Sequence, residues 1–494
     1  MKKLVSAFLC IALCLSMFCF SALAEDPVKL TLVIYGDSND ATNAFIAEKL
    51  RPKLIEELNI DLNLQFMSWG AQDQVRTMAM SGEAFGFMFD PNANPWSADG
   101  IMATIPYEKI EELAPAYLDA RGNNGFSWCK DTDGNIICIP LRSMPTADLD
   151  GIAVRNDILN AVGLDYTDIH TWDDYIAAAL KVHEQFPDLY VGHLGNIPRS
   201  AVGMPEGMYL TGIGSLVTAG PGLNGVAYLA MVDDGDPESD QVISILDTEY
   251  YREYCKLARQ MVELGMRDKD PLVEVDKSTA WTSGNALAGT AWTQMVYKTD
   301  ELSGVEGSEV RVIRFDDAKD IVKLDYNWTI AISIEDEKNV DNWLRLINWM
   351  YESKENNYFI SKGEEGVDWA YAEDGVDIVK LTDVAMVHDW MIATDKFEQI
   401  STEKYDEEDV AAYWALNDNA IRSKAMGFVF DPTPVATENA LLRAIITEKL
   451  EMYSKGFKDV DDGLDEVIQE MKNAGLDKYI AEVQKQFSEF MANK

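Results

Sequence analysis

Apolar and polar residues alternate along the first part of the chain in a pattern that predicts strands separated by helices. Residues 29–35, 60–67 and 85–89 have the apolar character of strands, and residues 41–58 and 71–80 have the spacing of helices. Strands and helices that alternate in this order build a parallel sheet with right-handed crossovers. The pattern therefore predicts an α/β fold, in which ligands bind beyond the carboxyl ends of the strands.

The remainder of the chain continues this mixed pattern without an internal repeat or a low-complexity linker. Thr171 is an N-cap, with Asp173 and Asp174 in the first turn of the helix that follows. Further strands are expected at 151–155, 286–295 and 328–334, and further helices at 249–264, at 340–351 and from about 438 onward.

The first 24 residues have the features of a secretory signal peptide. Two lysines precede the apolar residues 4–20, and small residues at positions −3 and −1 place the cleavage after Ala24. We therefore expect an exported protein, outside the cell or associated with its envelope. A lipid anchor is not supported, because Cys19 follows a bulky Phe18 rather than a small residue. No other apolar run reaches the length of a bilayer span.

The charge balance restricts the partners of the protein. The chain has 494 residues with 84 Asp and Glu against 42 Lys and Arg, which gives a formal net charge of −42. This excess argues against nucleic acid, because phosphate binding needs clustered basic residues. It also argues against docking on an anionic membrane surface. The length predicts two domains, or three.

Two cysteines flank a predicted hairpin turn at Asp133-Gly134. A two-residue turn places Cys129 opposite Cys138 at a non-hydrogen-bonded pair, within the range of a disulfide. We therefore expect a Cys129–Cys138 bond or, as the alternative, buried free thiols; a shift of one residue in the turn would break the pairing.

Signatures of metal binding and catalysis are absent from the sequence. Asp131, Asp133 and Asn135 alternate as calcium ligands do, but the glycine and the final acidic residue of an EF-hand loop are misplaced, which favours a turn. The chain has four histidines and no zinc motif, nucleophile elbow, phosphate-binding loop or dinucleotide fingerprint. We expect no catalytic residues, no metal and no cofactor, although spacing alone does not exclude a pair of carboxylates suited to glycoside hydrolysis.

Four residues follow the ends of predicted parallel strands and are therefore candidates for ligand binding. They are Asp37, Trp69, Asp90 and Trp96. Because the carboxyl ends of parallel strands meet at one edge of the sheet, we expect these four side chains to lie near one another.

A series of short motifs, taken in order, resembles the extracellular solute-binding proteins of family 1, the receptors of bacterial ABC importers. More closely, the chain is similar to the LplA-type lipoproteins that carry a C-terminal domain of unknown function. The matching stretches are residues 59–82, 133–140, 153–159, 163–164, 171–174, 348–351, 363–366, 427–431, 474–479 and 482–486. The missing lipid-attachment motif departs from this subgroup and puts membrane anchoring in doubt.

The resemblance implies a two-lobed, periplasmic-binding-protein-like α/β fold of type II, with a hinged cleft between the lobes. We place lobe one at 25–150 plus 286–340. Lobe two is then 151–285 plus 341–494, including the helical C-terminal region. Closure of the lobes on ligand follows from the same family picture.

The resemblance also implies an oligosaccharide ligand, the permease of an ABC importer as partner, and a monomer. Sugars present apolar faces to aromatic rings and hydroxyls to charged groups, and the chain has twelve tryptophans. Trp292, Trp328 and Trp369 therefore join the candidate binding residues, with Arg142 as a polar partner. A peptide- or other solute-binding receptor of the same fold remains an alternative, as does a secreted glycoside hydrolase.

Overall fold

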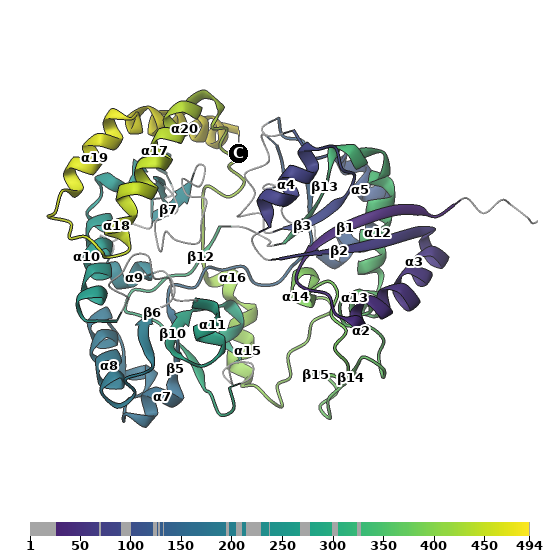
Figure 1. The fold of residues 1–494 in the computed structure, drawn as a ribbon, viewed down its shortest axis with the longest axis horizontal. Coiled ribbons are helices and arrows are strands. Elements are labelled where there is room, and N and C mark those ends of the chain that lie inside the picture. Colours follow the sequence, from purple (N-terminus) through teal and green to yellow (C-terminus); the bar gives the residue numbers. More distant parts are fainter. Residues whose placement is uncertain are drawn as a thin grey trace, which may run out of the picture.

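The computed structural model divides the chain into two α/β lobes (Figure 1). It describes residues 26–68, 71–89, 100–121, 126, 129–131, 133–193, 197–203, 210–213, 229–236, 238–266, 277–298, 305–323 and 328–493. Each lobe has its own sheet and its own large hydrophobic core. The predicted α/β class and two-lobed architecture are confirmed.

Lobe one is built on a five-stranded sheet in the order β2-β1-β3-β13-β4. Its first three strands are parallel, and β13 runs antiparallel between β3 and β4. This confirms the predicted β-α-β-α-β segment. The strands are β1 (Val28–Tyr35), β2 (Ile60–Met67), β3 (Gly86–Phe89), β4 (Cys138–Pro140) and β13 (Thr329–Ile332), and the crossover helices are α2 (Asp40–Phe45), η1 (Ile46–Leu50), α3 (Arg51–Leu58) and α4 (Gln72–Met80).

A helix from late in the chain packs against this sheet. The buried side chains of α12 (Val340–Glu352) include Trp343, Leu344 and Ile347. A Cβ at Gly86 would lie only 2.8 Å from the Trp343 ring, so the absence of a side chain there lets the indole pack against β3. The other elements on this lobe are α5 (Tyr107–Leu113), α6 (Pro115–Arg121), η7 (Ile334–Asn339), α13 (Lys354–Lys362), α14 (Asp389–Ile392) and the hairpin of β14 (Trp369–Tyr371) and β15 (Ile378–Lys380).

Lobe two is built on a four-stranded sheet in the order β11-β5-β10-β6. Its strands are β5 (Ile152–Arg155), β6 (Tyr190–His193), β10 (Ala286–Thr290) and β11 (Val310–Ile313). A smaller antiparallel sheet contains β7 (Leu210–Ile213), β8 (Ala230–Asp233) and β9 (Val242–Ser244). The remaining elements of its first part are α7 (Asn156–Ala161), η4 (Tyr166–Asp168), α8 (Trp172–Gln185), α9 (Arg199–Val202), η5 (Ile245–Asp247), α10 (Glu249–Glu263) and α11 (Lys277–Thr282).

The C-terminal helices complete the core of lobe two. Leu450, Tyr453, Tyr479 and Phe487 are buried in the same cluster as Tyr254 of α10. Figure 1 shows these helices covering the upper side of the lobe. They are η8 (Thr433–Val435), α17 (Ala436–Ile445), η9 (Ile446–Leu450), α18 (Glu451–Ser454), α19 (Leu464–Asn473) and α20 (Leu476–Asn493).

Two of the predicted lobe boundaries are wrong. Residues 286–313, which we expected in lobe one, contribute β10 and β11 to the sheet of lobe two. Residues 341–397, which we expected in lobe two, pack in the core of lobe one. The reason is long-range pairing: β10 pairs with β5 and β6, and Trp343 packs against Gly86, and neither contact has a local signal.

Among the described residues, three segments connect the lobes and bond to one another. The first contains Asp148, the second Ile321 and the third Ile421. Asp148 of the first segment bridges Ile321 in β12 (Ile321–Val322), which pairs with β16 (Ile421–Arg422) of the third segment. Ser143 also bridges Thr394. A small core forms here from Ala147, Leu149 and Val322 together with Tyr413 of α15 (Glu407–Trp414) and Leu416 of α16 (Leu416–Asn419).

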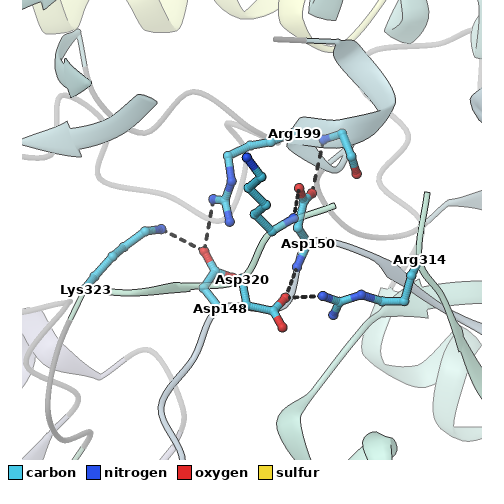
Figure 2. A network of polar contacts seen from close by, with 8 residues as sticks. Asp148, Asp150, Arg199, Arg314, Asp320 and Lys323 are labelled. Carbon is cyan, nitrogen blue, oxygen red and sulfur yellow. Dashed lines mark hydrogen bonds and ion pairs between the residues drawn. The ribbon is translucent and has the colours of Figure 1, made fainter. Parts of the chain in front are cut away.

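Carboxylates of the first two connecting segments form a polar network with basic side chains (Figure 2). The Asp148 carboxylate lies 2.8 Å from Lys323 Nζ and 3.4 Å from the Arg199 guanidinium. Desolvation raises the pKa of Asp148, but these two cations outweigh it and hold the pKa well below its usual range. Asp320 accepts hydrogen bonds from the Asp150 amide and from Arg314. The network ties the connecting segments to α9 of lobe two.

The register of the predicted hairpin is wrong by one residue. Lys130 pairs with Ile136, and the Ile137 amide donates to the Cys129 carbonyl at 2.7 Å. The turn is longer than expected because the Asp131 carboxylate accepts hydrogen bonds from the amides of residues 133 and 135. Cys129 and Cys138 are free and buried, and their thiols hydrogen bond to each other.

Candidate functional site

Four rings gather at the carboxyl end of β1 and form what we call the aromatic platform: Tyr35, Trp328, His388 and Trp390. Trp328 contacts Tyr35 edge-on at 6.5 Å between ring centroids, and Trp390 edge-on at 5.0 Å. His388 stacks on Trp390 at 5.4 Å. Trp390 is 39% exposed, and Trp328 and His388 are half-buried, so the platform presents ring surface to solvent.

Backbone conformation and a backbone hydrogen bond fix the position of Trp328 just before β13. Its φ is +65°, a left-handed conformation that a bulky residue rarely adopts. Its carbonyl accepts a hydrogen bond from the Leu141 amide at 2.8 Å, and the next residue begins β13. The indole is therefore directed by a constrained backbone rather than by a flexible loop.

Gly36 allows the histidine to approach the end of β1. Its φ is +126°, and a Cβ there would lie 3.1 Å from His388 Nε2. Burial lowers the pKa of His388, which keeps the imidazole neutral at physiological pH. Burial likewise raises the pKa of Tyr35 to about 12, so its hydroxyl stays protonated. The platform thus offers neutral rings with polar edges.

A second aromatic group lies at the connecting segments. Tyr297 follows the short helix η6 (Thr293–Val296), and its ring lies 5.2 Å from that of Tyr405 and 4.9 Å from that of Tyr413. Burial raises the pKa of Tyr297 and raises that of Tyr413 to about 12. These tyrosines therefore keep their hydroxyl protons.

Two ionisable groups, Arg142 and Glu398, lie near the second aromatic group. Burial lowers the pKa of Arg142, an effect that the nearby Tyr413 and Glu398 oppose. Burial raises the pKa of Glu398, and Asp389 raises it further, while Lys362, Lys354 and Arg142 lower it. Glu398 thus faces charges from both lobe one and the connecting segments.

The residues predicted from the sequence to bind a ligand lie at several separate places in the structure. Trp328 lies in the platform, and Asp37 is exposed directly after Gly36. Arg142 is buried beside the second aromatic group. Trp292 is 60% exposed beyond the end of β10, on lobe two. Trp69, Asp90 and Trp96 lie outside the described residues.

Trp369 is buried among other side chains and does not face solvent. It is 4% exposed, its Nε1 donates to the Gly363 carbonyl at 3.1 Å, and its ring packs edge-on against Tyr358 and Tyr371. These contacts place it in the packing between α13 and the β14–β15 hairpin. The buried ring is therefore not available to a ligand.

Sequence reasoning missed most of the residues that surround Trp328. His388 and Trp390 lie in a stretch without helical or strand periodicity, and α14 has only four residues. The usable signal was the run His388-Asp389-Trp390 itself, in which an aromatic residue, a carboxylate and an imidazole occur together outside any predicted core element. Tyr297, Tyr405 and Tyr413 gave no comparable signal.

Two negative findings apply to the part of the chain that the structure describes. There, no three His, Cys, Asp or Glu side chains lie close enough together to hold a metal ion. Nor does any described helix combine the length and the apolar character that a bilayer span requires.

The fold defined by these two lobes and three connecting segments is that of the two-lobed solute-binding proteins. Residues 424–492 match the domain of unknown function DUF3502. A "carbohydrate ABC transporter substrate-binding protein" of Streptococcus pneumoniae serotype 4 is 21% identical over 482 residues, which cover 93% of this chain and 90% of the relative.

Solved structures agree with this assignment of the fold. The N-glycan transport solute-binding protein NgtS of Streptococcus pneumoniae superposes with a TM-score of 0.76 at 17% identity, covering 94% of this chain and 99% of that one. Its complex with Man5GlcNAc gives a TM-score of 0.68 at 18% identity with the same coverage. The Streptococcus pneumoniae protein FusA in complex with kestose gives 0.58 at 14% identity, covering 94% of this chain and all of FusA.

Proposed function

We propose that this protein is the extracellular receptor of an ABC importer, which captures an oligosaccharide and delivers it to a membrane permease. The observation that carries the proposal is the aromatic platform at the carboxyl edge of the lobe-one sheet, next to the segments that connect the lobes. Binding sites for small molecules are typically lined by aromatic side chains with a few polar groups that set orientation. Rings with polar edges suit the apolar faces and the hydroxyls of sugars.

The fold and the relatives support the same proposal. Two lobes joined by bonded connecting segments permit hinge closure around a solute. One relative is named as a carbohydrate ABC transporter substrate-binding protein and NgtS as an N-glycan transport solute-binding protein, and the structure of FusA holds kestose. The signal peptide expected from the sequence agrees with a receptor that acts outside the cytoplasm.

Calorimetric titration of the purified protein with Man5GlcNAc, kestose and maltose tests the proposal. We expect at least one oligosaccharide to bind, to raise the melting temperature by mass action, and to be recovered unchanged after incubation. A mixture of short peptides serves as the competing ligand class. Binding of peptides without binding of sugars would contradict the proposal, and a hydrolysed sugar product would favour a glycoside hydrolase.

A further inference from the structure

The exposed indole of the aromatic platform is held by a very short helix. Trp390 lies in α14, which spans only Asp389–Ile392. A single helical turn is not stable by itself, because nucleation costs more backbone entropy than one hydrogen bond returns. The orientation of Trp390 therefore depends on contacts that α14 makes with the rest of lobe one.

An ion pair between Lys362 and Asp389 is one of these contacts. Lys362 Nζ lies 3.0 Å from Asp389 Oδ2, while Asp389 Oδ1 accepts the Trp390 amide at 2.8 Å. One carboxylate thus joins the ammonium to the backbone of the platform residue. The Lys362 side chain is 14% exposed and that of Asp389 is 48% exposed, so solvent reaches this pair from the Asp389 side only.

Lys362 is itself held firmly in the last turn of α13. Its ammonium lies 4.1 Å from the centroid of the Tyr358 ring, and Glu398 is a second carboxylate near it. The side-chain Nδ2 of Asn357, on the same helix, donates to the Ile392 carbonyl at 3.3 Å. The two ends of α14 are therefore fixed to one rigid helix.

We propose that Lys362 is a positioning residue for oligosaccharide binding, which acts through Asp389 to hold the Trp390 indole against His388 and Trp328. The inference rests on the proposed function. It adds Lys362, which acts on the ligand only through Asp389 and Trp390. Its physical basis is preorganisation: a ring that is already oriented in the free protein loses less entropy when the sugar binds.

The test uses neutral variants of both partners and a matched control. Lys362→Met keeps the length of the side chain and removes the charge. Asp389→Asn keeps an oxygen that can accept the Trp390 amide but removes the ion pair. Lys49→Met is the control, because Lys49 forms an exposed ion pair with Glu364 at 3.2 Å in the same lobe. Lys362→Arg restores the charge.

Two readouts separate positioning from a purely structural role. Near-UV circular dichroism of the ligand-free protein reports the packing of the indoles, and calorimetry with Man5GlcNAc, kestose and maltose reports affinity. We expect Lys362→Met and Asp389→Asn each to alter the near-UV signal and to weaken binding about tenfold. The double variant should be no weaker than either single variant. Lys362→Arg should recover most of the affinity, and Lys49→Met should resemble the wild type.

A folded Lys362→Met variant with wild-type affinity and wild-type near-UV signal would overturn the inference. If that variant does not fold, Asp389→Asn decides the question by the same two readouts. If the wild type binds none of the three sugars, the proposed function fails, whereas the near-UV signal still shows whether Lys362 positions Trp390.

Discussion

The indole of Trp390 stands edge-on to that of Trp328, with their ring centroids 5.0 Å apart and their planes inclined by 77°. The two residues are far apart in sequence, and they meet because β13 begins at the edge of the lobe-one sheet where β1 ends, and α14 packs at the same edge. This arrangement exposes the surfaces of both rings without burying either one completely.

Trp390→Ala should weaken oligosaccharide binding by more than about tenfold, which corresponds to ~1.4 kcal/mol. Exposed aromatic anchors dominate binding energies because they supply a large contact area with few rotatable bonds. Titration calorimetry measures the change. Trp172→Phe is the control, because Trp172 is buried in the core of lobe two against Tyr175 and Phe315: the substitution should lower the melting temperature and leave the affinity unchanged.

Trp292→Ala tests the contribution of lobe two. Its side chain is 60% exposed at the end of β10, which leaves the ring available for a ligand held between the lobes. We expect a loss of affinity of more than about tenfold. An unchanged affinity in a variant with an intact fold would remove Trp292 from the site and restrict sugar recognition to lobe one and the connecting segments.

Glu398 predicts a definite dependence of stability on pH. Its pKa is raised above the ordinary value of 4.5, first by burial and then by Asp389, against the opposing effects of Lys362, Lys354 and Arg142; Tyr358 hydrogen bonds to it as well. The folded state therefore holds the proton more tightly than the unfolded state. The resulting stabilisation is complete below pH 4.5 and is lost as the pH rises through the folded pKa.

Denaturant unfolding of the wild type and of Glu398→Gln between pH 4 and pH 7 measures this effect. Because glutamine stays neutral, the variant should gain stability relative to the wild type as the pH rises. A difference between the two proteins that is constant across this range would show that the pKa of Glu398 is not raised.

The cysteines give a chemical test of the hairpin register. Cys129, Cys138 and Cys255 form no disulfide and are buried, so the denatured mature protein, without residues 1–24 and their three cysteines, should react with three equivalents of a thiol reagent. A count of one would show that Cys129 and Cys138 are bonded despite their offset by one residue. The Cys255→Ser variant identifies the remaining thiol, since its count should fall from three to two.

Gly86→Ala should destabilise the protein by about 1–3 kcal/mol, because the added methyl group meets the Trp343 ring in a close-packed core. Denaturant unfolding measures the loss. The double variant with Trp343→Phe should recover part of it, since a smaller ring leaves room for the methyl group. Full stability of Gly86→Ala alone would show that the indole can move aside.

The local elements could be predicted from the sequence, and the contacts between distant segments could not. The apolar strands β1–β3 and the apolar spacing of Trp343, Leu344 and Ile347 are local patterns, and Thr171 caps α8 as expected. By contrast, β10 joins lobe two through pairing with β5, and α14 takes its place through Lys362. The platform was predicted only at Trp328, because His388 and Trp390 depend on such distant contacts.

The three connecting segments determine how the lobes of this protein can be produced separately. Neither lobe corresponds to one continuous stretch of coding sequence: lobe two joins residues 152–313 to the C-terminal helices, and lobe one joins the N-terminal half-sheet to residues 329–397. A simple truncation before residue 424 would strip the DUF3502 helices from Tyr254 and its neighbours and leave an open core. Isolated lobes for crystallography or biosensors would therefore need spliced or circularly permuted genes.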